Sequence, residues 1–178
     1  MIRTDRLLLT PPTLDDAPAI FRLRADPEVA VHLNRKLQTE VEEAEAFIVK
    51  LTGGFDEGKW HYWLVKSKEE GTFLGTICLW NFSEDRLSAE VGYELLPEHQ
   101  GKGFAGEALG AVLEFGFGAL ALDRIDAIIE APNRRSISLA ERFRFHVSRE
   151  FEEVSVHDGS PVKCLVYSLD RSVYEINQ

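Results

Sequence analysis

The stretch that most constrains the fold spans residues 91–109, where an apolar strand leads through a glycine-rich turn into a helix. Glycines at positions 101, 103 and 106 leave the main-chain N–H groups of this turn unobstructed. The helix that follows adds unpaired amides and a partial positive charge at its first turn. Together these features predict a cradle for an anion such as a pyrophosphate.

Read literally, the cradle satisfies a dinucleotide-binding pattern. Gly101-x-Gly103-x-x-Gly106 matches G-x-G-x-x-G, and Asp126 follows about 20 residues later, as that pattern expects. In dinucleotide-binding folds, however, the glycines follow directly on the first strand, and several strand–helix pairs come after them. Here the polar residues 97–100 intervene, and residues 107–178 are too few to complete a doubly wound domain. An oxidoreductase with a nucleotide cofactor therefore remains a secondary alternative.

The same residues also read Gln100-x-x-Gly103-x-Ala105, which resembles the Q/R-x-x-G-x-G/A acetyl-CoA loop of the GNAT superfamily of N-acetyltransferases. The resemblance continues, in order, through most of the chain. Its segments are Thr4-Asp5-Arg6-Leu7-Leu8-Leu9, Leu14-Asp15-Asp16-Ala17, Asp26-Pro27-Glu28-Val29, Val91-Gly92-Tyr93-Glu94, Gly103-Phe104-Ala105-x-Glu107-Ala108 and Asn133-x-x-Ser136. In that order they are similar to the branch that contains the Rim ribosomal-protein N-terminal acetyltransferases and their small-molecule relatives.

Composition predicts a single globular domain over residues 1–178. The chain is 44% hydrophobic and 28% charged, no linker or repeat divides it, and its length suffices for a sizeable core. The net charge of −10 argues against a nucleic-acid or anionic-membrane surface, because binding phosphates requires clustered Lys and Arg. This charge either favours a cationic co-substrate such as an amine or serves solubility. Without an apolar run of about 18 residues or a signal core, we expect a cytoplasmic protein.

Cysteine and histidine give no sign of a metal site. Cys78 and Cys164 have neither metal-ligand nor redox spacing, and the five histidines are scattered along the chain. We therefore expect no metal, and we expect both cysteines to pack as small hydrophobic residues in strands.

Hydrophobic periodicity predicts a mixed sheet with helices on both faces. One helix starts at Asp16, and another follows a Thr39-x-x-Glu42 capping box and stops at Gly53-Gly54. A third follows the cradle, and a fourth starts at Asn133 or Ser136. The expected strands cover residues 6–10, 60–66, 72–80, 88–96, 124–131, 145–151 and 163–169. Three of them form an antiparallel meander, and the strand–helix–strand unit around the cradle requires a parallel pair.

Tryptophans 60, 63 and 80 lie in or beside these strands, where they serve either the core or an acceptor pocket. The resemblance implies a GNAT-type α/β fold, in which a predominantly antiparallel sheet holds a central parallel pair that splays apart for CoA. By the same resemblance, residues 21–34 form part of the acceptor wall; alternatively, they belong to an ordinary helical hairpin over the sheet.

The resemblance also implies a set of cofactor-binding residues. The pantetheine arm lies between strands 92–96 and 124–131, and backbone groups around Tyr93 hold the thioester carbonyl and stabilise its oxyanion. Lys102, Arg134 and Arg135 are placed to help neutralise the phosphates of CoA, or they are ordinary surface charges. The implied CoA-binding residues are Leu95, Leu96, Gln100, Gly101, Lys102, Gly103, Phe104, Ala105, Gly106, Asn133 and Arg134.

Acetyl transfer to an amine requires a base for the amine and a donor for the leaving thiolate, whose reference pKa is about 8.5. Glu94 is the first choice of base, and Glu90, on the same strand face, is the second. The alternative role for Glu94 is to orient amides or to pair with an arginine. Ser136 is either the donor to the thiolate, an anchor for a water, or simply a helix cap, and Asn133 would bond the pantetheine.

Three departures from the resembled branch concern catalysis. Arg144-Phe145 stands where the branch has Gly-Phe, and Ala140 stands where many of these enzymes have a general-acid tyrosine. Ser155 occupies the place of a glutamate that can serve as base in Rim-type enzymes, with Glu152 and Glu153 nearby. These departures argue against carrying ribosomal-protein activity over directly.

The sequence thus predicts an acetyl-CoA-dependent N-acetyltransferase that transfers the acetyl group directly in a ternary complex, because no residue is arranged as a covalent nucleophile beside a base. The acceptor is a primary amine, either a protein N-terminus or a small molecule. A CoA-binding sensor without turnover is the first alternative. The resemblance also suggests a homodimer.

Overall fold

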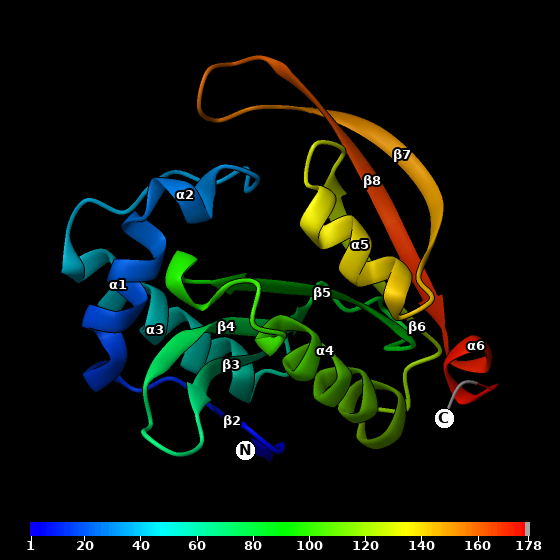
Figure 1. Cartoon of the computed structure of the whole chain (residues 1–178), viewed down its shortest axis with the longest axis horizontal. Coiled ribbons are helices and arrows are strands. Elements are labelled where there is room, and N and C mark those ends of the chain that lie inside the picture. The colour runs from blue at the N-terminus through cyan, green and yellow to red at the C-terminus, as the bar shows by residue number, and fades with distance from the viewer. Residues whose placement is uncertain (177–178) are drawn as a thin grey trace.

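The computed structural model describes residues 1–176. Its strands form one mixed sheet in the order β1-β2-β3-β4-β5-β6-β8-β7 (Figure 1). Consecutive strands from β1 to β5 are antiparallel, so the predicted meander is confirmed. The strands are β1 (Ile2–Arg3), β2 (Leu7–Thr10), β3 (His61–Ser67), β4 (Phe73–Trp80), β5 (Ser88–Leu95), β6 (Arg124–Glu130), β7 (His146–Val154) and β8 (Pro161–Asp170).

Helices cover both faces of the sheet, because each helix turns one apolar stripe toward the strands. One face packs against α4 and α5, and the other packs against α1 and α3 (Figure 1). The helices are α1 (Ala17–Ala25), α2 (Pro27–Ala30), α3 (Val41–Asp56), α4 (Phe104–Glu114), α5 (Arg134–Arg142) and α6 (Arg171–Ile176). Short helical turns also occur at Leu14–Asp16, Pro97–His99 and Phe115–Ala119. Within residues 1–176, none of the helices has the length and apolarity to cross a bilayer.

The parallel pair at the centre of the sheet is short. β5 and β6 pair only at Ser88 with Arg124, Ala89 with Ile125 and Glu90 with Asp126. Beyond these positions β5 stays paired with β4 and β6 with β8, so the two strands separate at their carboxyl ends. The predicted splay is therefore confirmed. A dinucleotide-binding domain needs a doubly wound parallel sheet, so the oxidoreductase alternative is wrong.

The start and the end of α3 both differ from the prediction. The helix begins at Val41 with Glu40 as its N-cap, and the Thr39 hydroxyl bonds Glu43 at 2.9 Å, so the capping box is wrong. The helix also continues through Gly53 and Gly54. A Cβ atom at Gly54 would lie 2.0 Å from the Trp60 ring, so glycine there permits close packing and does not end the helix.

The three tryptophans have different environments. Trp63 is buried in the core, and the Trp60 indole N–H donates to the Leu51 carbonyl at 2.9 Å. Trp80 lies at the end of β4 and is 46% exposed, so it belongs to the surface. β1, α2 and α6 were not predicted, because each is too short to show a hydrophobic period.

The turn after α5 keeps the geometry that a glycine normally provides. Arg144 has a φ of +67°, and its N–H donates to the Glu141 carbonyl at 3.0 Å. The Phe145 N–H donates to the Ala140 carbonyl at 3.1 Å, which completes a Schellman motif. The departure at Arg144 therefore leaves the fold intact, with an arginine in the left-handed region.

Candidate active site

The glycine turn presents free amides at the mouth of the splay. Gly101 and Gly103 have φ values of +73° and +83°, and Gly103 is the N-cap of α4. Within the described chain, the main-chain amides of residues 101–106 donate no hydrogen bond, and Glu107 N makes the first helical one, to the Gly103 carbonyl at 3.1 Å. These amides and the positive end of α4 together form the predicted anion cradle.

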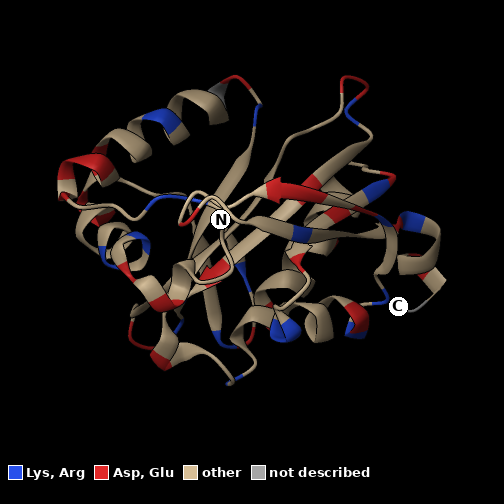
Figure 2. Cartoon of the chain, turned by 90° about the horizontal axis from the view of Figure 1, so that it is seen from above, with Lys and Arg blue, Asp and Glu red and all other residues tan. Residues whose placement is uncertain are grey.

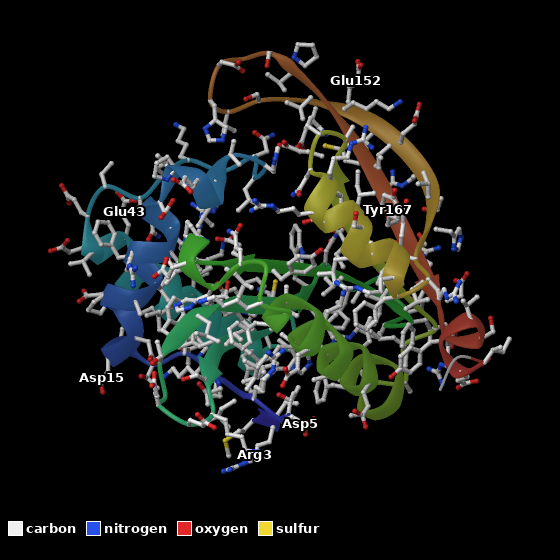
Figure 3. The ribbon with its side chains drawn as sticks, viewed as in Figure 1. Arg3, Asp5, Asp15, Glu43, Glu152 and Tyr167 are labelled. Carbon is white, nitrogen blue, oxygen red and sulfur yellow. The ribbon has the colours of Figure 1, made fainter. Side chains whose placement is uncertain are left out.

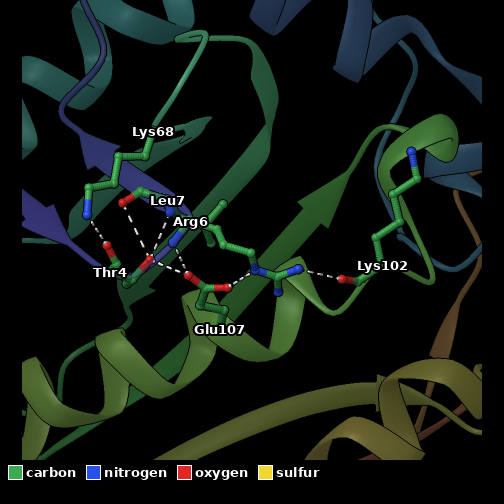
Figure 4. A network of polar contacts seen from close by, with 6 residues as sticks. All are labelled: Thr4, Arg6, Leu7, Lys68, Lys102 and Glu107. Carbon is green, nitrogen blue, oxygen red and sulfur yellow. Dashed lines mark hydrogen bonds and ion pairs between the residues drawn. The ribbon is translucent and has the colours of Figure 1, made fainter.

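A polar network fixes the cradle to the first strands of the sheet (Figure 4). Glu107, in the first turn of α4, accepts from the Thr4 hydroxyl at 2.6 Å and from the Arg6 amide at 2.7 Å. The Arg6 Nε also donates to Glu107 at 2.6 Å, and Arg6 Nη1 donates to the Lys102 carbonyl at 3.1 Å. Two segments of the family resemblance, residues 4–9 and 103–108, therefore meet in space.

Cations surround the cradle, although only some are the expected ones. The Arg135 guanidinium donates to the Gln100 side chain at 2.6 Å, and Gln100 in turn donates to the Leu95 carbonyl at 2.9 Å. The Arg142 guanidinium lies close to Gly106, 3.8 Å from the position of a Cβ atom there. The Lys102 side chain extends away from the Glu107 network (Figure 4).

Arg134 is the first residue of α5, and its charge acts on a residue of β8. Burial raises the pKa of Tyr167 on β8, and the charge of Arg134 partly offsets this effect, so the two side chains are near each other. Figure 3 shows Tyr167 beside α5, next to β8. The structure thus brings Arg135, Arg142 and Arg6 to the loop, whereas it places Arg134 beside β8.

The end of β5 lines one wall of the splay. The Leu96 amide donates to the Leu74 carbonyl at 2.9 Å, and the Leu96 side chain is fully buried. The Leu95 carbonyl is already occupied by Gln100. Both leucines therefore shape the wall of the splay. The main-chain groups that can still bind a ligand belong to β5 before Leu95 and to the glycine turn after Leu96.

Tyr93 and Ser136 meet across the splay. Asn133 caps α5 by accepting from the Ser136 amide at 3.1 Å, so the cap is Asn133 and the Ser136 hydroxyl is left for other contacts. The Tyr93 hydroxyl is buried and has no hydrogen-bond partner of normal geometry among the described residues. Burial raises the pKa of Tyr93, and the neighbouring Ser136 side chain lowers it in part. A hydroxyl pair therefore lies on the side of β5 that faces α4 and α5.

Glu94 lies on the opposite face of β5 and forms an ion pair. Its Oε2 accepts from Arg35 Nη2 at 2.9 Å, and each of the two side chains is 16% exposed. Arg35 Nη1 also donates to the Arg24 carbonyl at 2.7 Å, which ties the loop after α2 to the end of α1. Pairing with an arginine was the alternative role for Glu94, and this pairing is present.

Glu90 lies on the same face, at the closed end of the strand pair. The two glutamates are four residues apart on a strand, or about 13 Å. Burial raises the pKa of Glu90, and a hydrogen bond from the Asn81 amide at 2.7 Å opposes the rise. Because Glu90 lies where β5 and β6 are still paired, it is farther than Glu94 from the open end of the splay.

The loop after α2 and the β7–β8 hairpin together close one side of the site. Asn34 Nδ2 donates to the Val154 carbonyl at 3.0 Å, and Val156 N donates to Asn34 Oδ1 at 2.7 Å. Ser155 is buried in the turn between these contacts. Glu152 lies on the outer side of the hairpin (Figure 3), so it is directed away from the splay. Glu153 contacts Cys164, whose pKa burial raises to about 12.

These residues fit the CoA group that the sequence predicts. Six consecutive turn and helix amides and the nearby guanidinium groups of Arg6, Arg135 and Arg142 can hold phosphates. The splay has the open strand edges that a pantetheine arm needs. Within residues 1–176, His, Cys, Asp and Glu side chains form no group of three that could hold a metal ion.

Sequence reasoning missed several residues of this site, because their roles depend on contacts far apart in the chain. In the sequence, the only sign of the Arg6–Glu107 contact was that residues 4–9 and 103–108 both belong to the family resemblance. Arg24 lies in a segment that predicted only an acceptor wall, and Arg35 directly follows that segment. The missed residues are Arg6, Arg24, Arg35, Glu107, Arg142 and the hydroxyl of Tyr93.

Comparison with known proteins supports the same reading. Residues 6–146 match the family described as "Acetyltransferase (GNAT) domain". The chain is 30% identical over 169 residues to "Uncharacterized N-acetyltransferase YoaA" of Bacillus subtilis (strain 168), which covers 95% of this chain and 96% of that protein.

Two solved structures share the fold. One is a spermidine N-acetyltransferase from Vibrio cholerae in complex with CoA and spermine, with a TM-score of 0.86, 21% identity, and coverage of 97% of this chain and 99% of that chain. The other is a putative ribosomal-protein-serine acetyltransferase from Vibrio cholerae, with a TM-score of 0.79, 24% identity, and coverage of 95% and 96%. The chain therefore belongs to the GNAT acetyltransferase family and is an N-acetyltransferase.

Proposed function

We propose that this protein transfers an acetyl group from acetyl-CoA to a primary amine in a ternary complex. The observation that carries the proposal is the row of free amides at residues 101–106, which opens onto the splay between β5 and β6. Acetyl-CoA supplies the acetyl group as a reactive thioester. Residues 100–106, Asn133 and the nearby arginines hold its phosphates and its pantetheine arm.

The protein's own groups then manage two protons. Glu94 accepts a proton from the acceptor amine, directly or through water, once Arg35 yields one of its carboxylate oxygens. Ser136 directs its O–H toward the departing sulfur, and the buried Tyr93 hydroxyl beside it keeps that donor oriented. Main-chain N–H groups near residue 93 stabilise the developing oxyanion.

The proposal also covers the type of amine acceptor, the location of the enzyme in the cell and its oligomeric state. The Vibrio cholerae neighbours include an enzyme named for spermidine and one named for a ribosomal protein, so a small amine and a protein N-terminus both remain candidate acceptors. The similarity to the Rim-type branch supports a cytoplasmic enzyme that works as a homodimer. Size-exclusion chromatography with light scattering tests the dimer.

Replacing Gly103 by alanine tests the cradle. A Cβ atom at a φ of +83° is strained and would lie 3.3 Å from Arg6. If the roughly 1–2 kcal/mol of strain distorts the loop, calorimetry should show acetyl-CoA affinity weakened by about tenfold. Gly118→Ala is the matched control, because that position has open space around it. Equal affinity in the two variants would contradict the proposal.

Turnover is followed by thiol release from acetyl-CoA with a panel of N-terminal peptides, polyamines and amino acids. Acetylation of a panel member supports transferase action on that class of amine. Tight acetyl-CoA binding without turnover across the whole panel would favour the CoA-binding sensor instead.

A further inference from the structure

Two arginines lie around Glu94 near the carboxyl end of β5. Arg35 bonds Glu94 at 2.9 Å and also reaches the carbonyl of Arg24 at 2.7 Å. The Arg24 guanidinium lies 4.1 Å from the centre of the Phe47 ring, a favourable position for a cation. Two guanidinium groups therefore lie near one carboxylate in a partly buried site, and only Arg35 bonds to it.

The other ionisable groups near Arg24 do not supply the missing negative charge. The largest effects of neighbouring groups on the charge of Arg24 come from Glu94, Arg35, Tyr62 and Cys78. Burial raises the pKa of Tyr62, and burial raises the pKa of Cys78 to about 12, so both stay neutral at physiological pH. Burial also lowers the pKa of Arg24, the expected effect of removing a cation from water. The local balance is one surplus positive charge.

Unused donors accompany this surplus. Arg24 Nε and Arg35 Nε are buried, and neither has a hydrogen-bond partner among the described residues. A buried charge whose donors are incompletely satisfied is costly unless something pairs with it. A guanidinium pairs best with a carboxylate, because two parallel N–H bonds match its two oxygens. Both residues are only partly buried as a whole, although these two Nε atoms are not exposed.

We propose that the amine acceptor carries a carboxylate, as a free amino acid does, and that Arg35 and Arg24 bind this carboxylate. The inference rests on the proposed function, because it names the acceptor of the same site. The acceptor carboxylate takes the Arg35 donor that now holds Glu94, which leaves a Glu94 oxygen to receive the amine proton. A polyamine fits poorly, because it would bring further positive charge to two arginines.

Matched pairs of acceptors test this inference. Leucine and phenylalanine are compared with leucinamide and phenylalaninamide, and spermidine is added as a polyamine, with thiol release measured at a fixed saturating acetyl-CoA concentration. The amides have the more easily deprotonated amines, so intrinsic reactivity favours them. We expect kcat/KM to be at least about tenfold higher for each acid than for its amide, and to be lowest for spermidine. Equal or better use of the amides or of spermidine would overturn the inference.

The variant Arg24→Gln tests whether Arg24 binds the carboxylate of the acceptor. It should bring the acid-to-amide ratio of kcat/KM close to one, mainly by raising KM for the acids. Arg22→Gln, the same change at an exposed position of α1, should leave the ratio as in the wild type. If Arg24→Gln does not fold, Arg24→Lys keeps the charge without the fork and should give an intermediate ratio. A wild-type ratio in a folded Arg24 variant would also overturn the inference.

Failure of the inference is distinguishable from failure of the proposed function. Turnover with spermidine or the amides alone would leave the transferase proposal standing and remove only the carboxylate. If no acceptor reacts, calorimetry measures binding of leucine and of leucinamide to the protein loaded with CoA. Tighter binding of leucine supports the carboxylate site, whereas equal or absent binding contradicts it.

Discussion

At the residue scale, the central question is which glutamate accepts the proton. Glu94 lies beside the open end of the splay and pairs with Arg35, whereas Glu90 lies at the closed end and accepts from Asn81. Under the proposed function, Glu94 exchanges its Arg35 partner for the proton of the acceptor amine. The geometry therefore favours Glu94, which the sequence also placed first.

Glu94→Gln should lower kcat by about a hundredfold or more, within the usual range for loss of a general base. Glutamine still accepts a hydrogen bond from Arg35, so a circular dichroism spectrum like that of the wild type should confirm folding. Glu90→Gln, on the same strand face, is the control. It should change kcat by about twofold or less, because Glu90 lies at the closed end of the strand pair. The reverse pattern in the two variants would assign the base to Glu90.

At the element scale, Glu107 joins α4 to the first strands. Burial opposes its ionisation, but hydrogen bonds from Thr4 and Arg6 together outweigh burial and hold the pKa of Glu107 below its usual value. Because the folded-state pKa is the lower one, this contribution to stability is present above the unfolded pKa of about 4.3 and disappears as pH falls through the folded value.

Glu107→Gln should therefore lower the free energy of unfolding at pH 7 by about 1–2 kcal/mol, because it weakens hydrogen bonds to a charged group. The difference from the wild type should shrink as pH falls below about 4, where the wild-type carboxylate is protonated as well. Urea denaturation at several pH values measures it. A difference that persists unchanged at low pH would mean that the loss comes from packing.

The turn after α5 offers a second prediction at this scale. Arg144 adopts a φ of +67°, which costs an L-residue about 1–2 kcal/mol that glycine avoids. Arg144→Gly should raise the free energy of unfolding by about 1 kcal/mol, after the extra entropy of glycine in the unfolded chain is subtracted. Arg142→Gly, inside α5, should instead lower it by about 1 kcal/mol. Thermal unfolding compares the two, and destabilisation by both would show that the Arg144 side chain makes an important contact.

At the scale of the whole molecule, acidic and basic residues alternate along the helices and strands (Figure 2), so the net charge of −10 is not gathered in one element. The cradle keeps its own cations within this acidic protein. The net charge argued against a nucleic-acid surface, and it favoured either a cationic co-substrate or solubility alone. The local balance around Arg24 instead supports the proposed carboxylate. A small number of buried groups therefore indicate the ligand more directly than the sum over the chain.

Much of the fold was predictable, because it depends on local patterns. Alternating and helical periods located the long strands and helices, and the glycines at 101 and 103 located the cradle. The end of α3 was mispredicted because Gly54 serves a tertiary contact with Trp60. The pairs Arg35–Glu94 and Tyr93–Ser136 join distant segments, and no local pattern encodes them.

The sheet also separates between the carboxyl ends of β5 and β6, and bound CoA should bridge these two strands. Beyond Glu90 and Asp126, β5 is held only by β4 and β6 only by β8 within the described sheet, so their facing edges lack strand partners. A pantetheine arm bound there would supply hydrogen bonds to these edges and slow their local opening. Saturating CoA should therefore slow hydrogen exchange at least about tenfold for some amides of residues 91–95 and 127–130, since each tenfold change corresponds to about 1.4 kcal/mol. Exchange in β2 and β3 should change little. NAD has a pyrophosphate but no pantetheine, so it should leave the splay unprotected; equal protection by NAD, or CoA protection confined to other strands, would contradict this account.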